Sequence, residues 1–259
     1  MSRFFSDKFK NLVPYTPGEQ PQDKKYIKLN TNESPYPPSE KAVNAAFKAA
    51  HSLMLYPDPD CTLLSELYAK KLGVCADEIL VTNGSDEILN FAFSAFCDKN
   101  TPAVFPDITY GFYSVFADLY NISYKTIPLK DDFSINASDY FNANATVFIA
   151  NPNAPTGIAL SVFEIEEIVK NNPDNVVVID EAYVDFGAQS AVSLIHKYDN
   201  LLITQTFSKS RSMAGARLGF GIGCKSLIAD LNTLKYSTNP YNVNAMTAAA
   251  GIGTLEDDE

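Results

Sequence analysis

The sequence predicts an α/β protein with a mostly parallel β-sheet that helices cover on both faces. Between residues 78 and 222, short apolar segments alternate with segments whose apolar residues recur at helical spacing. Residues 176–179 (VVVI) are consecutive β-branched residues, which is typical of a strand that is buried on both faces. Helices that connect such strands favour a parallel sheet between two helical layers.

The expected helices begin after an arm that is rich in proline. Residues 1–38 hold six prolines and little periodicity, so we expect an extended arm there. Ser39 is expected to cap a helix over 40–50, and a second helix over 61–72 closes near Gly73. Further helices are expected over 87–97, 110–120, 162–171 and 241–255.

Short apolar runs give the expected strands: 78–82, 102–105, 124–129, 146–150, 176–179, 201–205 and 217–222. We therefore divide the chain into an N-terminal arm (1–38), a large domain (39–240) and the start of a terminal helix (241–259). No internal repeat or low-complexity segment interrupts this order.

Composition and charge argue against several classes of protein. The 259 residues carry a formal charge of -11, whereas proteins that bind nucleic acids or membrane surfaces need a basic face. No segment approaches the ~20 apolar residues of a membrane span. The four cysteines lie far apart and the histidines are His51 and His196, so we expect neither a metal site nor a histidine-dependent hydrolase. We expect a cytoplasmic protein with free thiols.

Polar residues follow four of the expected strands. The segments are 83–86 (NGSD), 151–157 (NPNAPTG), 180–183 (DEAY) and 206–209 (TFSK). Because open α/β sheets bind ligands beyond the carboxyl ends of their strands, these segments predict a ligand site at one rim of the sheet. The helix start after Gly84 also offers free N–H groups to an anion.

Each of these residues also has a structural interpretation. Ser85 is placed to cap a helix, and Asp180 to cap or pair with a neighbouring group. Lys209 and Arg217 are compatible with solvated surface positions. The glycines of 219–223 (GFGIG) are a weak dinucleotide-binding signal and fit better a strand where backbones pass closely.

The motifs in their order resemble those of the fold-type-I aminotransferases, which use pyridoxal phosphate. NPNAPTG, DEAY and TFSKSRSMAGARLG follow one another in that family's order, each at the end of an expected strand. More narrowly, PYTPGEQP, KLNTNESPYPP, LYPDP and PYNVN resemble histidinol-phosphate aminotransferases. The likeness spans essentially the whole chain and implies a pyridoxal-phosphate-dependent transferase.

The resemblance implies a role for the residues around the cofactor ring. Lys209 would carry the cofactor and shuttle a proton, and Asp180 would keep the pyridine nitrogen protonated. Tyr183 would donate to the phenolic oxygen of the ring, and Tyr110 would stack on its face. Asn153 would contact the ring oxygen in place of an asparagine that the family often has at the position of Ala154.

Other residues are implied for the phosphate groups and for assembly. The cofactor phosphate would bind at Gly84, Ser85, Thr206, Ser208 and Arg217. Tyr56 would reach the cofactor phosphate of the neighbouring subunit, which implies a homodimer, and Tyr15 would lie near the substrate phosphate. Both tyrosines also fit exposed turn positions.

The implied activity is amino-group transfer between histidinol phosphate and 2-oxoglutarate, in histidine biosynthesis. A threonine-phosphate decarboxylase, an aromatic amino-acid aminotransferase and a truncated, impaired cofactor-binding homologue are the alternatives. Members of the family continue past the position of Glu259 into a small domain that supplies the arginine for the substrate carboxylate. The resemblance therefore implies an incomplete small domain.

Overall fold

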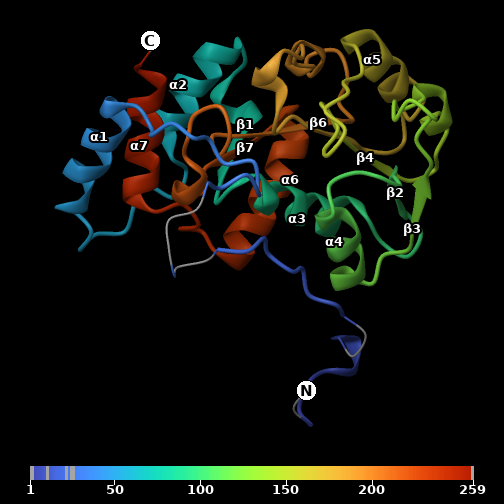
Figure 1. The fold of residues 1–259 in the computed structure, drawn as a ribbon, viewed down its shortest axis with the longest axis horizontal. Helices are drawn as coiled ribbons and strands as arrows, with labels where there is room; N and C mark the ends of the chain where they lie inside the picture. The colour runs from blue at the N-terminus through green and yellow to red at the C-terminus, as the bar shows by residue number, and fades with distance from the viewer. Residues whose placement is uncertain (1–2, 10–11, 21–22, 24–26, 258–259) are drawn as a thin grey trace.

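One seven-stranded sheet forms the centre of the molecule (Figure 1). The computed structural model describes residues 3–9, 12–20, 23 and 27–257. The strand order is β1-β7-β6-β5-β4-β2-β3. The strands are β1 (Ile79–Thr82), β2 (Ala103–Pro106), β3 (Tyr124–Ile127), β4 (Thr146–Ala150), β5 (Val177–Asp180), β6 (Leu201–Thr206) and β7 (Gly219–Gly223).

The pairing confirms the mostly parallel sheet and adds one exception. All neighbouring strands from β6 to β3 pair in parallel. Strand β7 runs antiparallel to both of its neighbours, β1 and β6. The carboxyl ends of β1, β6, β5, β4 and β2 therefore share one rim, and β7 starts at that rim.

Helices cover both faces of the sheet, as expected. They are α1 (Glu40–Ala50), α2 (Thr62–Leu72), α3 (Ser85–Phe96), α4 (Phe112–Tyr120), α5 (Val162–Lys170), α6 (Lys225–Thr238) and α7 (Ala245–Leu255). Phe148 of β4 packs into one core with α3, α4 and α6, and the next residue, Ile149, packs into the other with α1, α2, α5 and α7. This alternation explains the continuous apolar strands, because both faces of the sheet are removed from water.

Local signals set several helix ends. Ser39 accepts a hydrogen bond from the N–H of Ala42 at the start of α1, and Gly73 ends α2 with a φ of 74°. Both expectations are confirmed, because a side-chain oxygen satisfies a free N–H at one end and glycine adopts the left-handed conformation at the other.

The last strand of the sheet and the helix after it differ from the expectation in two ways. Helix α6 was missed, although Leu227, Ile228 and Leu231 recur at helical spacing and are buried. The strand expected from residue 217 begins at Gly219, because Arg217 has a left-handed φ of 57° after a short 3-10 turn.

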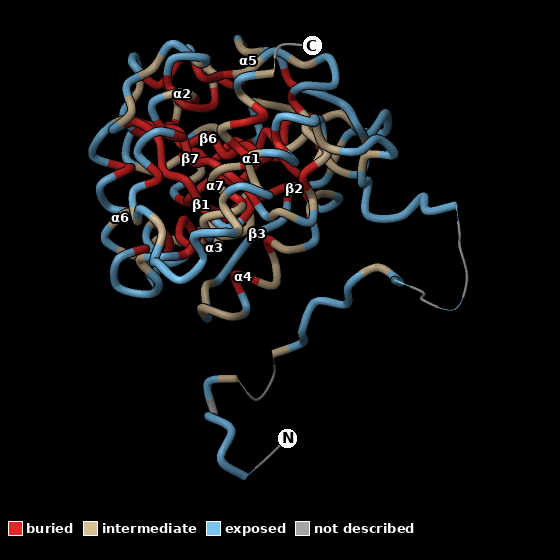
Figure 2. Tube along the Cα trace, turned by 90° about the vertical axis from the view of Figure 1, so that its left-hand side faces the viewer, coloured by how far each residue is buried: buried red, intermediate tan, exposed pale blue. Residues whose placement is uncertain are grey.

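Most of the described residues before 39 have no regular secondary structure, as their prolines predict, and the exception is a 3-10 turn at Asp7–Phe9. Residues 1–2, 10–11, 21–22 and 24–26 of the expected arm lie outside the described residues. Figure 2 shows the described residues before 27 as a mostly exposed trace that leaves the packed body. Residues 30–34 lie against the body, where Ser212 donates a hydrogen bond to Ser34 at 2.8 Å between their hydroxyl oxygens. Within the described ranges, no helix combines the length and apolar character that crossing a bilayer requires.

Candidate active site

One cavity lies at the shared rim of the sheet and collects most of the predicted residues. Ser85 and Asp86 line it from α3, Ala150 from β4, and Asp180 from β5. The predicted residues that line it are Ser85, Tyr110, Asp180, Tyr183, Thr206, Ser208, Lys209 and Arg217. The strand-end argument therefore predicted the place of this cavity, and tertiary folding brings residues from six segments together there.

The loop from β1 to α3 forms one end of the cavity. Gly84 has a φ of 80°, and a Cβ atom built on it would lie 2.5 Å from Nη2 of Arg217. Strand β7 passes so close behind this loop that a Cβ on Gly219 would lie 2.3 Å from the backbone nitrogen of Ser85. The close backbone passage predicted for the GFGIG segment is confirmed.

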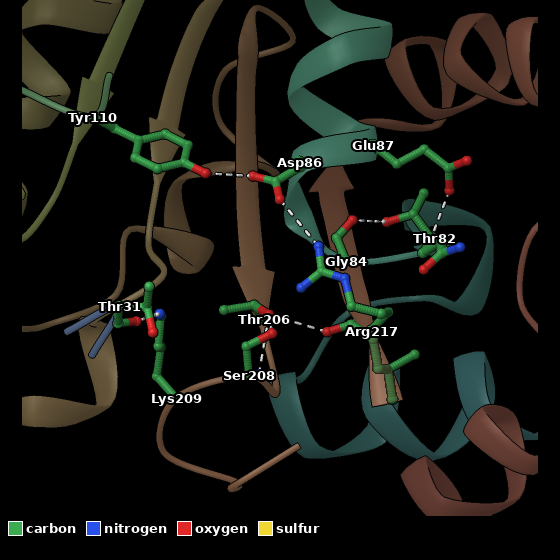
Figure 3. Close-up of polar contacts among 12 residues, drawn as sticks. Thr31, Thr82, Gly84, Asp86, Glu87, Tyr110, Thr206, Ser208, Lys209 and Arg217 are labelled. Carbon is green, nitrogen blue, oxygen red and sulfur yellow. Dashed lines mark hydrogen bonds and ion pairs between the residues drawn. The ribbon is translucent and has the colours of Figure 1, made fainter. Parts of the chain in front are cut away.

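Hydroxyl groups and an arginine face the same loop (Figure 3). Thr206 Oγ1 lies 2.9 Å from Ser208 Oγ and 3.1 Å from the carbonyl oxygen of Leu218, to which it donates. Arg217 donates through Nη2 to Oδ2 of Asp86 at 3.0 Å. A helix N-terminus flanked by a guanidinium and two hydroxyl groups is a site for a phosphate-sized anion.

Asp86 lies in the cavity but was not among the site residues predicted from the sequence. Its other oxygen, Oδ1, accepts a hydrogen bond from the hydroxyl of Tyr110 at 2.7 Å, so one carboxylate links Tyr110 to Arg217 across the cavity. Burial and the charge of Asp86 raise the pKa of Tyr110, which therefore stays protonated. The NGSD segment was recognised, but nothing in it distinguished a side chain that bridges two others from an ordinary first-turn aspartate.

Asp180 is the buried carboxyl group of the cavity, with 5% of its surface exposed. Oδ1 accepts from the N–H of Ala182 at 3.1 Å, and Oδ2 accepts from the hydroxyl of Tyr113 at 3.2 Å. Burial, with the nearby charges of Asp86 and Glu181, outweighs these two donors and raises the pKa of Asp180 to about 7. A cation placed next to this carboxyl group would favour its ionised form.

The pKa of Asp180 makes a prediction about the stability of the cofactor-free chain. The folded chain binds this proton more tightly than the unfolded chain does, so its stability falls as the pH rises from about 4 through 7. Asp180→Asn removes the effect. The difference in the free energy of unfolding between variant and parent should therefore shift by about 2–3 kcal/mol in favour of the variant as the pH rises from 5 to 8. Urea denaturation at both pH values checks this, and a pH-independent difference would contradict it.

Lys209 follows β6 and is held by the N-terminal segment. Its Nζ donates to the carbonyl oxygen of Thr31 at 2.8 Å and lies 5.5 Å from the ring centroid of Tyr183. The Nδ2 of Asn32 donates to the hydroxyl of Tyr183 at 3.0 Å. Thr31 and Asn32 belong to the KLNTNESPYPP motif, which was recognised without any residue in it being assigned to the site.

Four predicted residues are not among those that line the cavity: Gly84, which directly precedes the lining residue Ser85, and Asn153, Tyr56 and Tyr15. The amide of Asn153 donates to the carbonyl of Ile108 and accepts from Thr109, whereas its neighbour Ala154 faces the cavity. Tyr56 is 81% exposed and stacks on Tyr241, with 4.6 Å between ring centroids. Tyr15 is half exposed, and its ring contacts Phe112. Among the residues that the structure describes, no group of three or more histidine, cysteine, aspartate or glutamate side chains suits a metal ion.

A primary amine, a buried carboxyl group and an anion-binding loop at one rim of a doubly covered sheet define a class of protein: an α/β enzyme with a site for a phosphorylated ligand. The family model for class I and II aminotransferases matches residues 24–259. The chain is 52% identical to the histidinol-phosphate aminotransferase of Brachyspira hyodysenteriae and 54% identical to that of Marinomonas sp.. The chain belongs to the class I and II aminotransferases and, within them, to the histidinol-phosphate aminotransferases.

Both relatives are longer than this chain. All of the chain aligns with each of them and spans 74% of their length. The crystal structure of a putative histidinol-phosphate aminotransferase from Erwinia carotovora atroseptica superposes with a TM-score of 0.82 at 27% identity, covering 88% of this chain and 69% of that one. The Sinorhizobium meliloti enzyme, solved with pyridoxal-5'-phosphate, has the same fold, with a TM-score of 0.80 at 24% identity over 88% of this chain and 63% of that one.

Proposed function

We propose that this chain transfers an amino group from histidinol phosphate to 2-oxoglutarate with pyridoxal phosphate as its cofactor, in histidine biosynthesis. The observation that carries the proposal is the meeting of Lys209, Asp180 and Arg217 around one cavity, in a chain about half identical to histidinol-phosphate aminotransferases. When bound, the cofactor supplies an aldehyde for the amino group and a ring that accepts electrons from the broken Cα–H bond.

The residues present fit this cofactor at three points. The cradle beside Gly84 and Arg217, which a Cβ atom would fill, suits its phosphate together with Ser85, Thr206 and Ser208. Asp180 suits a protonated ring nitrogen, since a buried carboxylate gains a neighbouring cation. Lys209 supplies the amine for the aldehyde. Tyr110 would stack on the ring, and Tyr183 would donate to its phenolic oxygen.

The reaction would need one side chain to move a proton. Lys209 Nζ would take the proton from Cα of the substrate and deliver it to the carbon of the cofactor's aldehyde group. For this the amine must leave the carbonyl oxygen of Thr31, to which it now donates. Asn32 would keep the Tyr183 hydroxyl in place while Lys209 moves. Asn153 has its amide engaged elsewhere, so the ring-oxygen contact would fall to Tyr183.

We also propose a cytoplasmic homodimer in which Tyr56 completes the partner's phosphate site. Its support is a set of exposed apolar side chains on α1, in the turn after it and at the start of α2: Val43, Phe47, Leu53, Met54, Leu55, Tyr56 and Leu63. Exposed apolar side chains that concentrate in one stretch of the chain favour a protein interface. The four cysteines are free thiols, which fits a reducing compartment.

Mixing the cofactor-loaded protein with single amino donors tests the proposed substrate. Histidinol phosphate should convert the enzyme-bound cofactor to its amine form at least ~100-fold more efficiently than phenylalanine or threonine phosphate, as expected of a site with dedicated polar contacts. Absorbance in a stopped-flow instrument follows the conversion. Preference for phenylalanine, or release of CO₂ from threonine phosphate, would replace the proposed substrate with an alternative one.

A further inference from the structure

A buried tyrosine, Tyr113, contacts Asp180 from the side of the sheet that carries α4. Its hydroxyl donates to Oδ2 of Asp180 at 3.2 Å. Tyr113 is the second residue of α4, and its side chain is entirely removed from solvent. The roles proposed above leave this contact unused.

The surroundings of the Tyr113 ring leave it little freedom. The ring contacts those of Phe93, Phe105 and Phe148 at centroid distances of 6.5, 5.6 and 5.8 Å. It also meets the ring of Tyr110 edge-on at 5.7 Å. Because interiors are close-packed, this set of rings fixes where the one polar atom of the side chain lies. That atom is placed on Asp180.

The charges around Asp180 show what the hydroxyl does there. Groups that surround it are Asp86 of α3, Tyr110 just before α4, Tyr113 of α4, and Lys209 and Arg217 across the cavity. The charge of Glu181, the next residue in the chain, also acts on it. Burial, Asp86 and Glu181 favour the protonated carboxyl group, whereas the two hydrogen bonds favour the ionised form. Burial and Asp180 raise the pKa of Tyr113 well above its usual value, so this hydroxyl remains a donor.

We propose that Tyr113 is a positioning residue that holds the Asp180 carboxylate in its ionised form and aims it at the ring nitrogen of the cofactor. The inference rests on the proposed function, because it requires a cofactor with a basic ring nitrogen. Without the hydroxyl, Asp180 retains one donor, from Ala182, against the same burial and the same two negative neighbours. The Asp180 carboxyl group would then stay protonated and would lose the negative charge that keeps the ring nitrogen protonated.

The test compares Tyr113→Phe with Tyr140→Phe. Tyr140 is an equally buried tyrosine whose hydroxyl has no hydrogen-bond partner within the described ranges, so its variant controls for loss of a buried oxygen. Cofactor affinity is measured by spectroscopic titration, with pyridoxal phosphate and with its analogue in which the ring nitrogen is replaced by carbon. Tyr113→Phe should weaken binding of pyridoxal phosphate about tenfold or more, since the lost donor bonds a charged group.

Two further results are expected with the carbon analogue and with the control variant. Tyr113→Phe should bind the carbon analogue as the parent does, and Tyr140→Phe should bind both compounds as the parent does. Equal affinity of the parent and Tyr113→Phe for pyridoxal phosphate, or equal losses with both compounds, would overturn the inference and leave the proposed function intact. Failure of the parent itself to bind pyridoxal phosphate would overturn the proposed function instead.

Discussion

Lys209→Ala is expected to abolish covalent attachment of pyridoxal phosphate and to lower the rate of amino transfer by roughly 10⁴-fold. Among the described residues that line the cavity, the variant removes the only amine, and with it the group proposed to move the α-proton. Borohydride reduction of the loaded protein, followed by peptide mapping, measures attachment. Single-turnover absorbance with histidinol phosphate measures the rate.

Lys225→Ala is the matched control for this prediction. Lys225 is an exposed lysine whose Nζ pairs with Asp77 at 2.8 Å, and its loss should leave attachment and rate unchanged. A label that maps to another lysine in the parent, or a Lys209→Ala rate close to that of the parent, would contradict the assignment.

Lys209→Ala also tests whether two subunits share each active site, as proposed. Chains carrying Lys209→Ala and chains carrying Tyr56→Ala should each be impaired alone. Random mixing makes half of the dimers hybrid, and each hybrid has one intact site, so about a quarter of the parent activity should return. No recovery after mixing would show that Tyr56 does not act across a subunit boundary.

Gly219→Ala is expected to disrupt the end of the cavity that we propose for the cofactor phosphate. A Cβ atom at this position would lie 2.3 Å from the backbone nitrogen of Ser85 and 2.4 Å from the backbone carbon of Gly84. Backbone atoms cannot swing aside as a side chain does, so β7 and the Gly84–Ser85 loop must separate. We expect a loss of about 3 kcal/mol of stability, or roughly 5–10 °C in Tm, and cofactor binding at least ~100-fold weaker.

Gly215→Ala controls for the loss of a glycine four residues earlier in the chain, because a Cβ there meets no atom within 4 Å. Its Tm and cofactor affinity should match those of the parent. Calorimetry and spectroscopic titration provide the two measurements. A Gly219→Ala protein with the parent's Tm and affinity would show that β7 and the loop do not pack as the structure places them.

The pattern of residues along the chain determined most of the architecture. The strand Thr146–Ala150 was predicted with its observed ends. A continuous run of five apolar or β-branched residues between turn residues is typical of a strand that is buried on both faces. The cavity rim was also predictable, since a parallel sheet brings its carboxyl ends together whatever lies between the strands. Helix α6 was missed although its periodicity was present in the sequence, and the reversed direction of β7 leaves no trace in hydrophobic periodicity.

The family resemblance rested on ordered local motifs, and the comparisons confirmed it. Contacts between segments that lie far apart in the chain could not be predicted from the sequence. That Asp86 joins Tyr110 to Arg217, that Tyr113 bonds Asp180, and that Thr31 holds Lys209 each depend on residues 24 or more positions apart. Local patterns record which face of an element is buried, because burial repeats with the period of the helix or strand. A single hydrogen bond between two elements repeats nowhere, so only the tertiary structure decided which polar side chains meet.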